Sequence, residues 1–313
     1  MAATPVHDPH TSTMEVSMIR PVTAGLDGSP ESLAAAEWAA REAEDRGLPL
    51  RLVQAWIWRQ QDVPVAEDLD TQKRWALSVL EEAKDLVCDR HPGLAVSTEL
   101  ICDTAPAVLL AEAEAAEMLV LGSSGHGAVA GFLLGSVGQQ VLARAQRPVI
   151  LVRAGHRPAN EGGGAAEHDS GNVVVGLQEP AEIPAPLLEF AFNAAAVRGS
   201  ALHAVHAPDL PPLYGYGPAV GRLAGQEGGI TRQAERALTD ALRPWRERYP
   251  KVPVTHAVEL AHASSVVLSA APQAGLVVVG RKMHRRALGM RIGPVAHAVL
   301  HHATAPVAVV PHD

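Results

Sequence analysis

The sequence contains few cysteines and few aromatic residues. Cys88 and Cys102 are the two cysteines among 313 residues, and aromatic residues make up 4% of the chain. Two thiols cannot build a disulfide framework or a four-thiolate zinc site. We therefore expect reduced thiols packed as ordinary side chains, as is usual in the cytoplasm.

The sequence also lacks the features of a membrane or nucleic-acid-binding protein. No apolar run reaches the length of a membrane span, and the first 17 residues have neither the basic start nor the apolar core of a secretory signal. The formal net charge of −8 disfavours a general basic surface for nucleic acid. We expect a cytoplasmic protein that binds neither membranes nor nucleic acid, with residues 1–17 as a flexible tail.

Aliphatic residues are abundant, and they recur in two copies of one pattern. Each copy opens with a short aliphatic strand, at 19–27 and at 172–178, followed by an alanine-rich helix. These helices are expected to end at Gly47 and Gly199, glycines suited to a left-handed cap. Matching strands follow, such as MLVLG at 118–122 and LVVVG at 276–280, and the copies close with RPVILV and APVAVV.

Strands that alternate with helices predict an α/β protein of two tandem, doubly wound parallel-sheet domains. The near-continuous aliphatic runs are typical of strands covered on both faces. We place the domains at 18–154 and 172–313, joined by a glycine-rich polar linker at 155–171. In the second copy we expect a helix at 230–249 and a third strand at 258–260.

One loop of the first copy carries a candidate phosphate site. Gly122 ends the fourth strand, Gly125 follows it, and Gly135-Ser136 begins the next helix after nine further residues. Ligands of such sheets bind beyond the carboxyl ends of the strands, a glycine allows close backbone approach, and a helix amino end attracts phosphate. The alternative is structural: Ser136 and Gln139 also form a capping-box pattern. The combination favours the phosphate site.

The pattern G-x2-G-x9-G-S resembles the ATP-binding motif of the universal stress protein family. The opening Gly25-Leu26-Asp27-Gly28-Ser29-Pro30 and the closing Arg147-Pro148-Val149 share the likeness, which covers nearly all of the chain outside tail and linker. The resemblance implies a Rossmann-like fold of the adenine-nucleotide α-hydrolase type, and a bound ATP that Mg²⁺ could accompany. His297 and His301 have the i, i+4 spacing of two metal ligands, but no third ligand is evident, so we expect an exposed helix face and no metal site.

The family's ATP contacts transfer to this chain position by position. The resemblance implies that adenine and ribose lie against Gly25 and Asp27, and that adenine also contacts the main chain at Ala55. It implies that ribose and phosphates lie on the loop residues Gly122, Ser123, Gly125, His126 and Gly127. It further implies that the last phosphates contact Gly135, Ser136 and Val137. Asp27 has a second, compatible interpretation, because Asp-Gly-Ser-Pro is also a turn and helix-start signal.

The second copy departs from this motif at three positions. Met283 replaces the second glycine, Pro294 replaces the serine and Gln178 replaces the opening aspartate. Proline removes a hydroxyl and a backbone donor but still suits the first turn of a helix. We therefore predict one ATP site per chain. As an alternative, basic side chains could hold an anion in the second copy, or form a solvated loop; these are Arg281, Lys282, Arg285, Arg286 and Arg291.

The resemblance implies a nucleotide-binding regulatory protein of the stress response. It also implies that the copies pair through their last strands, at 149–153 and 307–310, as an intrachain pseudo-dimer that could form homodimers or bind an unknown protein partner. The alternatives are a slow ATPase or phosphotransferase, and a nucleotide-free interaction module. An enzyme is disfavoured because no Walker lysine and no nucleophile paired with a base are evident.

Overall fold

The computed structural model describes residues 19–57, 69–123, 135–154, 171–178, 182–208, 220–283 and 292–313. The expected tail lies outside these ranges, as does the expected linker apart from Gly171. The elements of the first copy are β1 (Val22–Leu26), α1 (Pro30–Arg46), β2 (Leu50–Trp56), α2 (Leu69–Arg90), β3 (Val96–Cys102), α3 (Ala105–Ala115), β4 (Met118–Ser123), α4 (Ser136–Arg144) and β5 (Val149–Arg153). The elements of the second are β6 (Asn172–Leu177), α5 (Ala185–Arg198), β7 (Leu202–His206), α6 (Val220–Arg248), β8 (Val254–Val258), α7 (Ala263–Ala270), a 3₁₀ turn (Ala271–Gln273), β9 (Ala274–Lys282), α8 (Pro294–His302) and β10 (Val307–His312).

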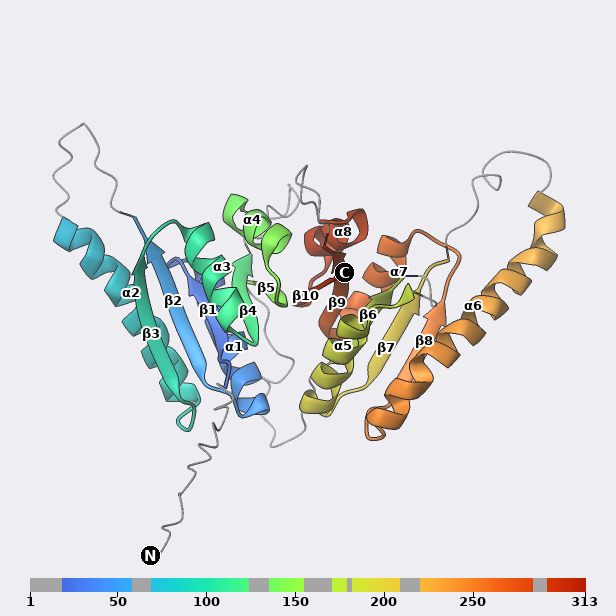
Figure 1. The fold of residues 1–313 in the computed structure, drawn as a ribbon, viewed down its shortest axis with the longest axis horizontal. Coiled ribbons are helices and arrows are strands. Elements are labelled where there is room, and N and C mark those ends of the chain that lie inside the picture. The colour runs from blue at the N-terminus through green and yellow to red at the C-terminus, as the bar shows by residue number, and fades with distance from the viewer. Residues whose placement is uncertain are drawn as a thin grey trace, which may run out of the picture.

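The ten strands form one sheet in the order β3-β2-β1-β4-β5-β10-β9-β6-β7-β8 (Figure 1). Neighbouring strands are parallel except β5 and β10, which pair antiparallel with Leu151 opposite Val307 and Val149 opposite Val309. Each half of the sheet therefore repeats one strand order, and the last strand of each copy lies at the centre. The predicted α/β, doubly wound fold class is confirmed.

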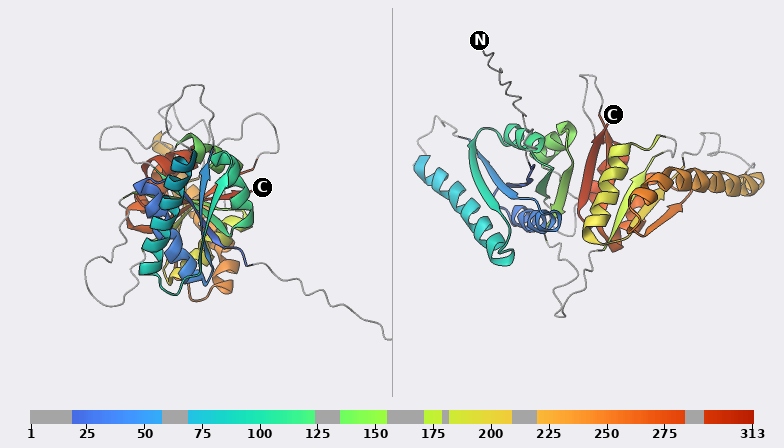
Figure 2. Two further views of the ribbon diagram at one scale, coloured as in Figure 1. Left: turned by 90° about the vertical axis from the view of Figure 1, so that its left-hand side faces the viewer. Right: turned by 60° about the horizontal axis from the view of Figure 1, so that its bottom comes forward.

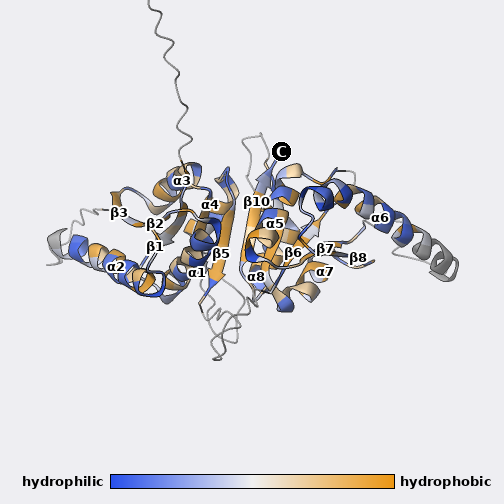
Figure 3. Ribbon diagram, turned by 90° about the horizontal axis from the view of Figure 1, so that it is seen from below, coloured by the Kyte–Doolittle hydropathy of each residue, from blue (hydrophilic) through white to orange (hydrophobic). Residues whose placement is uncertain are grey.

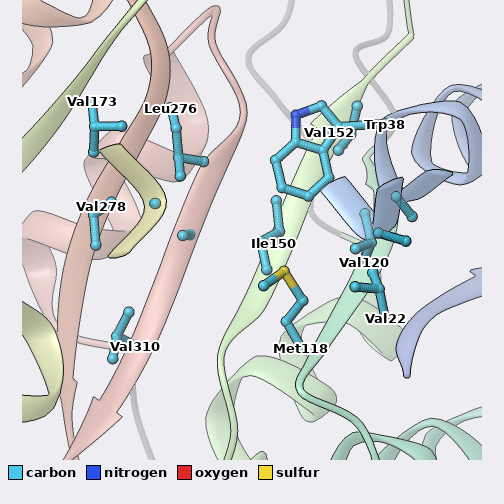
Figure 4. Packing of buried hydrophobic residues seen from close by; sticks show 14 of the residues in the cluster. Val22, Trp38, Met118, Val120, Ile150, Val152, Val173, Leu276, Val278 and Val310 are labelled. Atoms are coloured by element: carbon cyan, nitrogen blue, oxygen red, sulfur yellow. The ribbon is translucent and has the colours of Figure 1, made fainter. Parts of the chain in front are cut away.

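Helices cover both faces of the sheet, and the two copies share a core on each face. Alternate residues of β5 face opposite sides: Ile150 and Val152 belong to one hydrophobic cluster, whereas Val149 and Leu151 belong to the other. Both clusters contain side chains from both copies. Figure 3 shows the apolar central strands between helices with polar outer faces, and Figure 4 shows Ile150 and Val152 of one copy beside the strands that carry Leu276 and Val310 of the other. Burial of this apolar surface is the main force that holds the copies together.

A buried ion-pair network adds a second contact between the copies. Glu42 of α1, with 2% of its surface exposed, accepts hydrogen bonds from Arg46 of the same helix at 2.6 Å and from Arg198 of α5. Arg46 also donates to the side-chain oxygen of Asn193 on α5, and the Arg198 guanidinium lies 5.3 Å from the centre of the Trp38 ring. One carboxylate thus serves two arginines at matching positions of the repeat.

The local signals for helix ends are confirmed. Gly47 and Gly199 follow α1 and α5 with φ of 63° and 61°, a left-handed conformation that costs a glycine little. Pro30 occupies the first position of α1, and the hydroxyl of Ser29 accepts the N–H of Ser32 at 3.1 Å. Sequence and structure agree here because a cap depends on neighbouring residues alone.

Three expectations were wrong. The third strand of the second copy is Val254–Val258 rather than 258–260. Because it is an edge strand, it contains polar residues and lacks the continuous aliphatic run by which the buried strands were predicted. Helix α6 begins at Val220, ten residues before the expected start, and continues past Pro244 to Arg248. The expected burial of both thiols was wrong for Cys102, which is exposed at the end of the edge strand β3, whereas Cys88 is half-buried.

Among the described residues, no helix combines the length and apolarity that a membrane crossing needs.

Candidate functional site

The carboxyl ends of β1 and β4 meet the amino ends of α1 and α4 at one edge of the sheet (Figures 1 and 2). Gly25, near the end of β1, faces the leucines of the neighbouring elements: a Cβ atom there would lie 2.7 Å from Cδ2 of Leu109 and 2.7 Å from Cδ2 of Leu121. The absence of a side chain at Gly25 lets α3 pack directly on β1. Gly25 therefore has a packing role at the predicted adenine position.

Asp27 forms the turn between β1 and α1. Its Oδ1 accepts the N–H of Ser29 at 3.0 Å and also the Ser29 hydroxyl. Gly28 stands in a left-handed conformation with φ of 80°. The turn interpretation of Asp27 is therefore confirmed. The carboxylate is nevertheless exposed at the edge of the sheet, where a ligand could reach its second oxygen.

Gly122 brings the first turn of α1 against β4. A Cβ atom at this position would lie 2.4 Å from the carbonyl carbon of Glu31 and 2.6 Å from the nitrogen of Ser32, both main-chain atoms. The next residue, Ser123, is 2% exposed, and its hydroxyl donates to the carbonyl of Val152 at 3.1 Å. A ligand at this position would meet the main chain of Ser123 rather than its hydroxyl.

Helix α4 begins at Ser136, and Gly135 is its N-cap, with φ of −56° and ψ of 154°. Within the described residues, no side chain caps the helix. The capping-box interpretation of Ser136 and Gln139 is therefore wrong: Ser136 lies one position too far into the helix. Ser136 is exposed and Val137 is half-buried. The first N–H groups of a helix have no acceptor inside it, so this end offers donors toward the sheet edge.

Ala55 lies at a cavity beyond the end of β2. The cavity has a volume of about 450 Å³, a size typical of small-molecule sites. Its lining residues come from β2, the residue after it, and the start of α2; they are Gln54, Ala55, Trp56, Ile57, Thr71, Gln72, Trp75 and Ala76. The predicted contacts Gly125, His126 and Gly127 lie outside the described residues, so the structure does not place them relative to this cavity.

Trp75 was not among the predicted site residues. Its side chain is 57% exposed, and a Cβ atom at Gly28 would lie 3.0 Å from its Cζ2. The indole therefore lies beside the turn that holds Asp27 as well as lining the cavity. The available signal was a tryptophan on the helix after β2 in a chain with few aromatic residues. The sequence alone does not show whether this tryptophan faces the site or lies on another side of the helix.

The second copy closes the corresponding edge with its own chain. Strands β9 and β10 stay paired beyond Gly280, with His312 opposite Lys282, and the N–H of Met283 donates to the carbonyl of His312 at 2.7 Å. A Cβ atom at Gly280 would lie 2.9 Å from Nε2 of His312, which is 4% exposed. The imidazole thus lies on the side of Gly280 where the first turn of α1 lies beside the matching Gly122.

Arg281 does not belong to an open anion site. Its guanidinium donates to the carbonyl of Ala143 at 2.9 Å and to the carbonyl of Ala145, both at the end of α4 in the first copy. The side chain is buried, and this desolvation lowers the pKa of Arg281. The anion-site alternative was wrong for Arg281 because the residue contacts the other copy. Lys282 is exposed, and the remaining basic residues, Arg285, Arg286 and Arg291, lie outside the described residues.

Pro294 occupies the first position of α8 as predicted. The N-cap before it, Gly293, has φ of −59° and ψ of 156°, nearly the values of Gly135 before Ser136. The helix therefore starts in the same conformation with either residue. What differs is chemistry: proline provides neither a hydroxyl nor a main-chain donor.

Comparison with known proteins identifies the family of both copies. The model of the universal stress protein family matches residues 18–153 and 171–311. The universal stress protein Rv2005c of Mycobacterium tuberculosis is 32% identical over 302 residues, with 92% of this chain and 96% of that protein covered, and one from Mycolicibacterium smegmatis is 35% identical with the same coverage. The crystal structure of a universal stress protein from Archaeoglobus fulgidus superposes with a TM-score of 0.65 at 16% identity, covering 95% of this chain and all of that one. The chain therefore belongs to the universal stress protein family.

Proposed function

We propose that the first copy, within 18–154, binds one ATP per chain and that the protein acts as a cytoplasmic nucleotide-dependent regulator of the stress response. The observation that carries the proposal is the amino end of α4 at Ser136, which no described side chain caps and which lies on the sheet edge that also bears Asp27. The second copy, within 172–313, has proline at the helix start, and its strands β9 and β10 stay paired past Gly280 up to Lys282 and His312. The contrast supports a single site.

The residues of the first copy fit an adenine nucleotide in both size and charge. The cavity at Ala55 is large enough for a purine, and the exposed indole of Trp75 offers a face for stacking. In the proposed mode, the main chain at Ala55 meets the base and Asp27 meets the ribose. Phosphates would lie on the main chain from Gly122 to Gly127 and end at the donors of α4.

We propose regulation rather than catalysis because the Asp27 carboxylate, the acidic group at the proposed site, already holds the turn before α1 and is less free to act as a general base. One oxygen of its carboxylate is engaged by Ser29 in the turn that starts α1. Among the described residues, no group of three or more histidines, cysteines or acids is placed to hold a metal ion. An accompanying Mg²⁺ would therefore be held mainly by the phosphates, and occupancy of the site would be the signal that a partner or a second chain senses.

Ser136→Pro is expected to weaken ATP binding about 10- to 100-fold without loss of the fold. The substitution removes a hydroxyl and a main-chain donor, and a hydrogen bond to a charged group contributes about 1.5–3 kcal/mol. Helix α8 starts with proline at the matching position, so α4 should keep its start. Isothermal titration calorimetry with ATP measures the effect. Ser136→Ala separates the hydroxyl from the main-chain donor, and equal affinity of Ser136→Pro and wild type would contradict the site.

The chain is expected to bind ATP with a stoichiometry of one. Equilibrium dialysis of the full-length protein with ATP tests this, since the second copy has lost the serine and has the main chain of Met283 hydrogen-bonded to His312. Pro294→Ser is the matched control, and we expect it to leave the stoichiometry at one because Gln178 and Met283 still replace the aspartate and the second glycine of the motif. Two molecules of ATP per wild-type chain would refute the single-site proposal.

A further inference from the structure

We propose that Arg281 of the second copy is a positioning residue for the ATP site of the first copy. The inference rests on the proposed function, because it concerns α4, whose amino end offers the phosphate donors. It gives the second copy a role in a site to which it contributes no ligand contact. The connection runs through the opposite, carboxyl end of the same helix.

The contact consists of two hydrogen bonds from one guanidinium group to the carboxyl end of α4. The two terminal nitrogens of Arg281 donate to the carbonyls of Ala143 and Ala145. Carbonyls in the last turn of a helix lack partners within it, and a cation there also complements the negative end of the helix dipole. The planar guanidinium can hold two acceptors at once, which fixes direction as well as distance. Arg281 is 4% exposed, so water competes little for these bonds.

Helix α4 is short, and its packing in the described residues is limited to one side, against α3 and the core below it. It has nine residues, of which Val141 and Leu142 are its buried side chains. Ser136, Gln139 and Gln140 are exposed. A short helix that packs through Val141, Leu142 and the half-buried Val137 can still tilt about this line of contacts, and tilting would move the amino end at Ser136. The contact of Arg281 at the other end opposes this movement.

The reverse contact provides a built-in comparison. Arg153, the last residue of β5, donates to the carbonyl of His301 at 2.8 Å, near the end of α8. Each copy thus sends one arginine to the last helix of the other. The two arginines are not at matching positions of the repeat, since Arg281 matches Ser123. Arg153 therefore contacts a helix that starts with Pro294, whereas Arg281 contacts the helix that starts with Ser136.

Arg281→Met and Arg153→Met form a matched pair of variants. Each keeps an apolar stem and removes the donors from one of the two contacts. In calorimetric titrations of the full chain with ATP, we expect Arg281→Met to raise the Kd about tenfold, within the usual range of coupling between sites. We expect Arg153→Met to stay within about twofold of wild type, because the donation to α8 is what the substitution removes, while the main-chain pairing of Arg153 with Ser123 is kept. Arg281→Lys, which keeps the charge but not the fork, should fall between wild type and Arg281→Met.

Amide hydrogen exchange provides a readout that does not require ATP. We expect Arg281→Met to speed exchange in α4 while α8 stays protected, and Arg153→Met to do the reverse. Equal weakening of ATP binding by both variants, or unchanged binding and α4 exchange in Arg281→Met, would overturn the inference. If Arg281→Met does not fold, the same comparison is made between Arg281→Lys and Arg153→Lys. Wild-type protein that binds no ATP would instead overturn the proposed function.

Discussion

Glu42→Ala is expected to lower the free energy of unfolding by about 3–5 kcal/mol, because it removes the carboxylate that pairs with two buried arginines. The Glu42 side chain is 2% exposed, and those of Arg46 and Arg198 are 8% and 7% exposed. Burial lowers the pKa of Arg198, while the charge of Glu42 opposes that shift. Removal of the carboxylate takes from both desolvated guanidinium groups the negative charge that they share, although Asp45 still acts on Arg198, and this costs more than the pair contributes when intact.

Urea unfolding followed by circular dichroism measures this loss. Glu189→Ala is the matched control: Glu189 pairs with Arg248 at 2.9 Å, but both side chains are more than half exposed, so its loss should change stability by about 1 kcal/mol or less. If Glu42→Ala changes the free energy of unfolding by less than about 1 kcal/mol, the arginines find water or other partners, and the buried ion pairs do not stabilise the fold as proposed. Because Arg198 belongs to the second copy, the loss should appear as weaker docking of α5 on α1.

The fold could be predicted from the sequence because its signals are local. Aliphatic strands, helix-ending glycines such as Gly47 and Gly199, and the prolines at helix starts depend on neighbouring residues, and they are where predicted. The edge strand β8 was misplaced because its polar residues reflect its place in the sheet, which no local pattern records.

The parts of the site that escaped prediction depend on distant contacts. Arg281 stands in a basic run that suggested an anion site, yet its partners lie 136 and 138 residues away, on α4. Trp75 reaches Gly28 only because α2 packs beside the turn after β1. His312 lies beside Gly280 because β10 extends alongside β9. Each case requires the arrangement of the sheet, which sequence spacing alone does not provide.

Gly122→Ala is expected to destabilise the protein by about 3 kcal/mol, at the upper end of the usual cost of overpacking, and to weaken ATP binding as well. The added methyl carbon would start 2.4 Å from the main chain of Glu31, and backbone cannot move aside as the end of a side chain can. Relief requires the first turn of α1 to retreat from β4. That turn is tied to Asp27 through Ser29, so the predicted ribose contact would move with it.

Gly280→Ala provides the matched control at the equivalent position of the second copy. There the added carbon would start 2.9 Å from Nε2 of His312, the far end of a side chain, which can rotate away more easily than main chain can move. We expect a cost of about 1 kcal/mol or less and unchanged ATP affinity. Thermal unfolding and ATP titration of the two variants compare the positions directly. If both alanines cost the same, the close approach of α1 to β4 is not what requires glycine at 122. If Gly122→Ala destabilises the chain but binds ATP normally, the role of Gly122 is confined to packing.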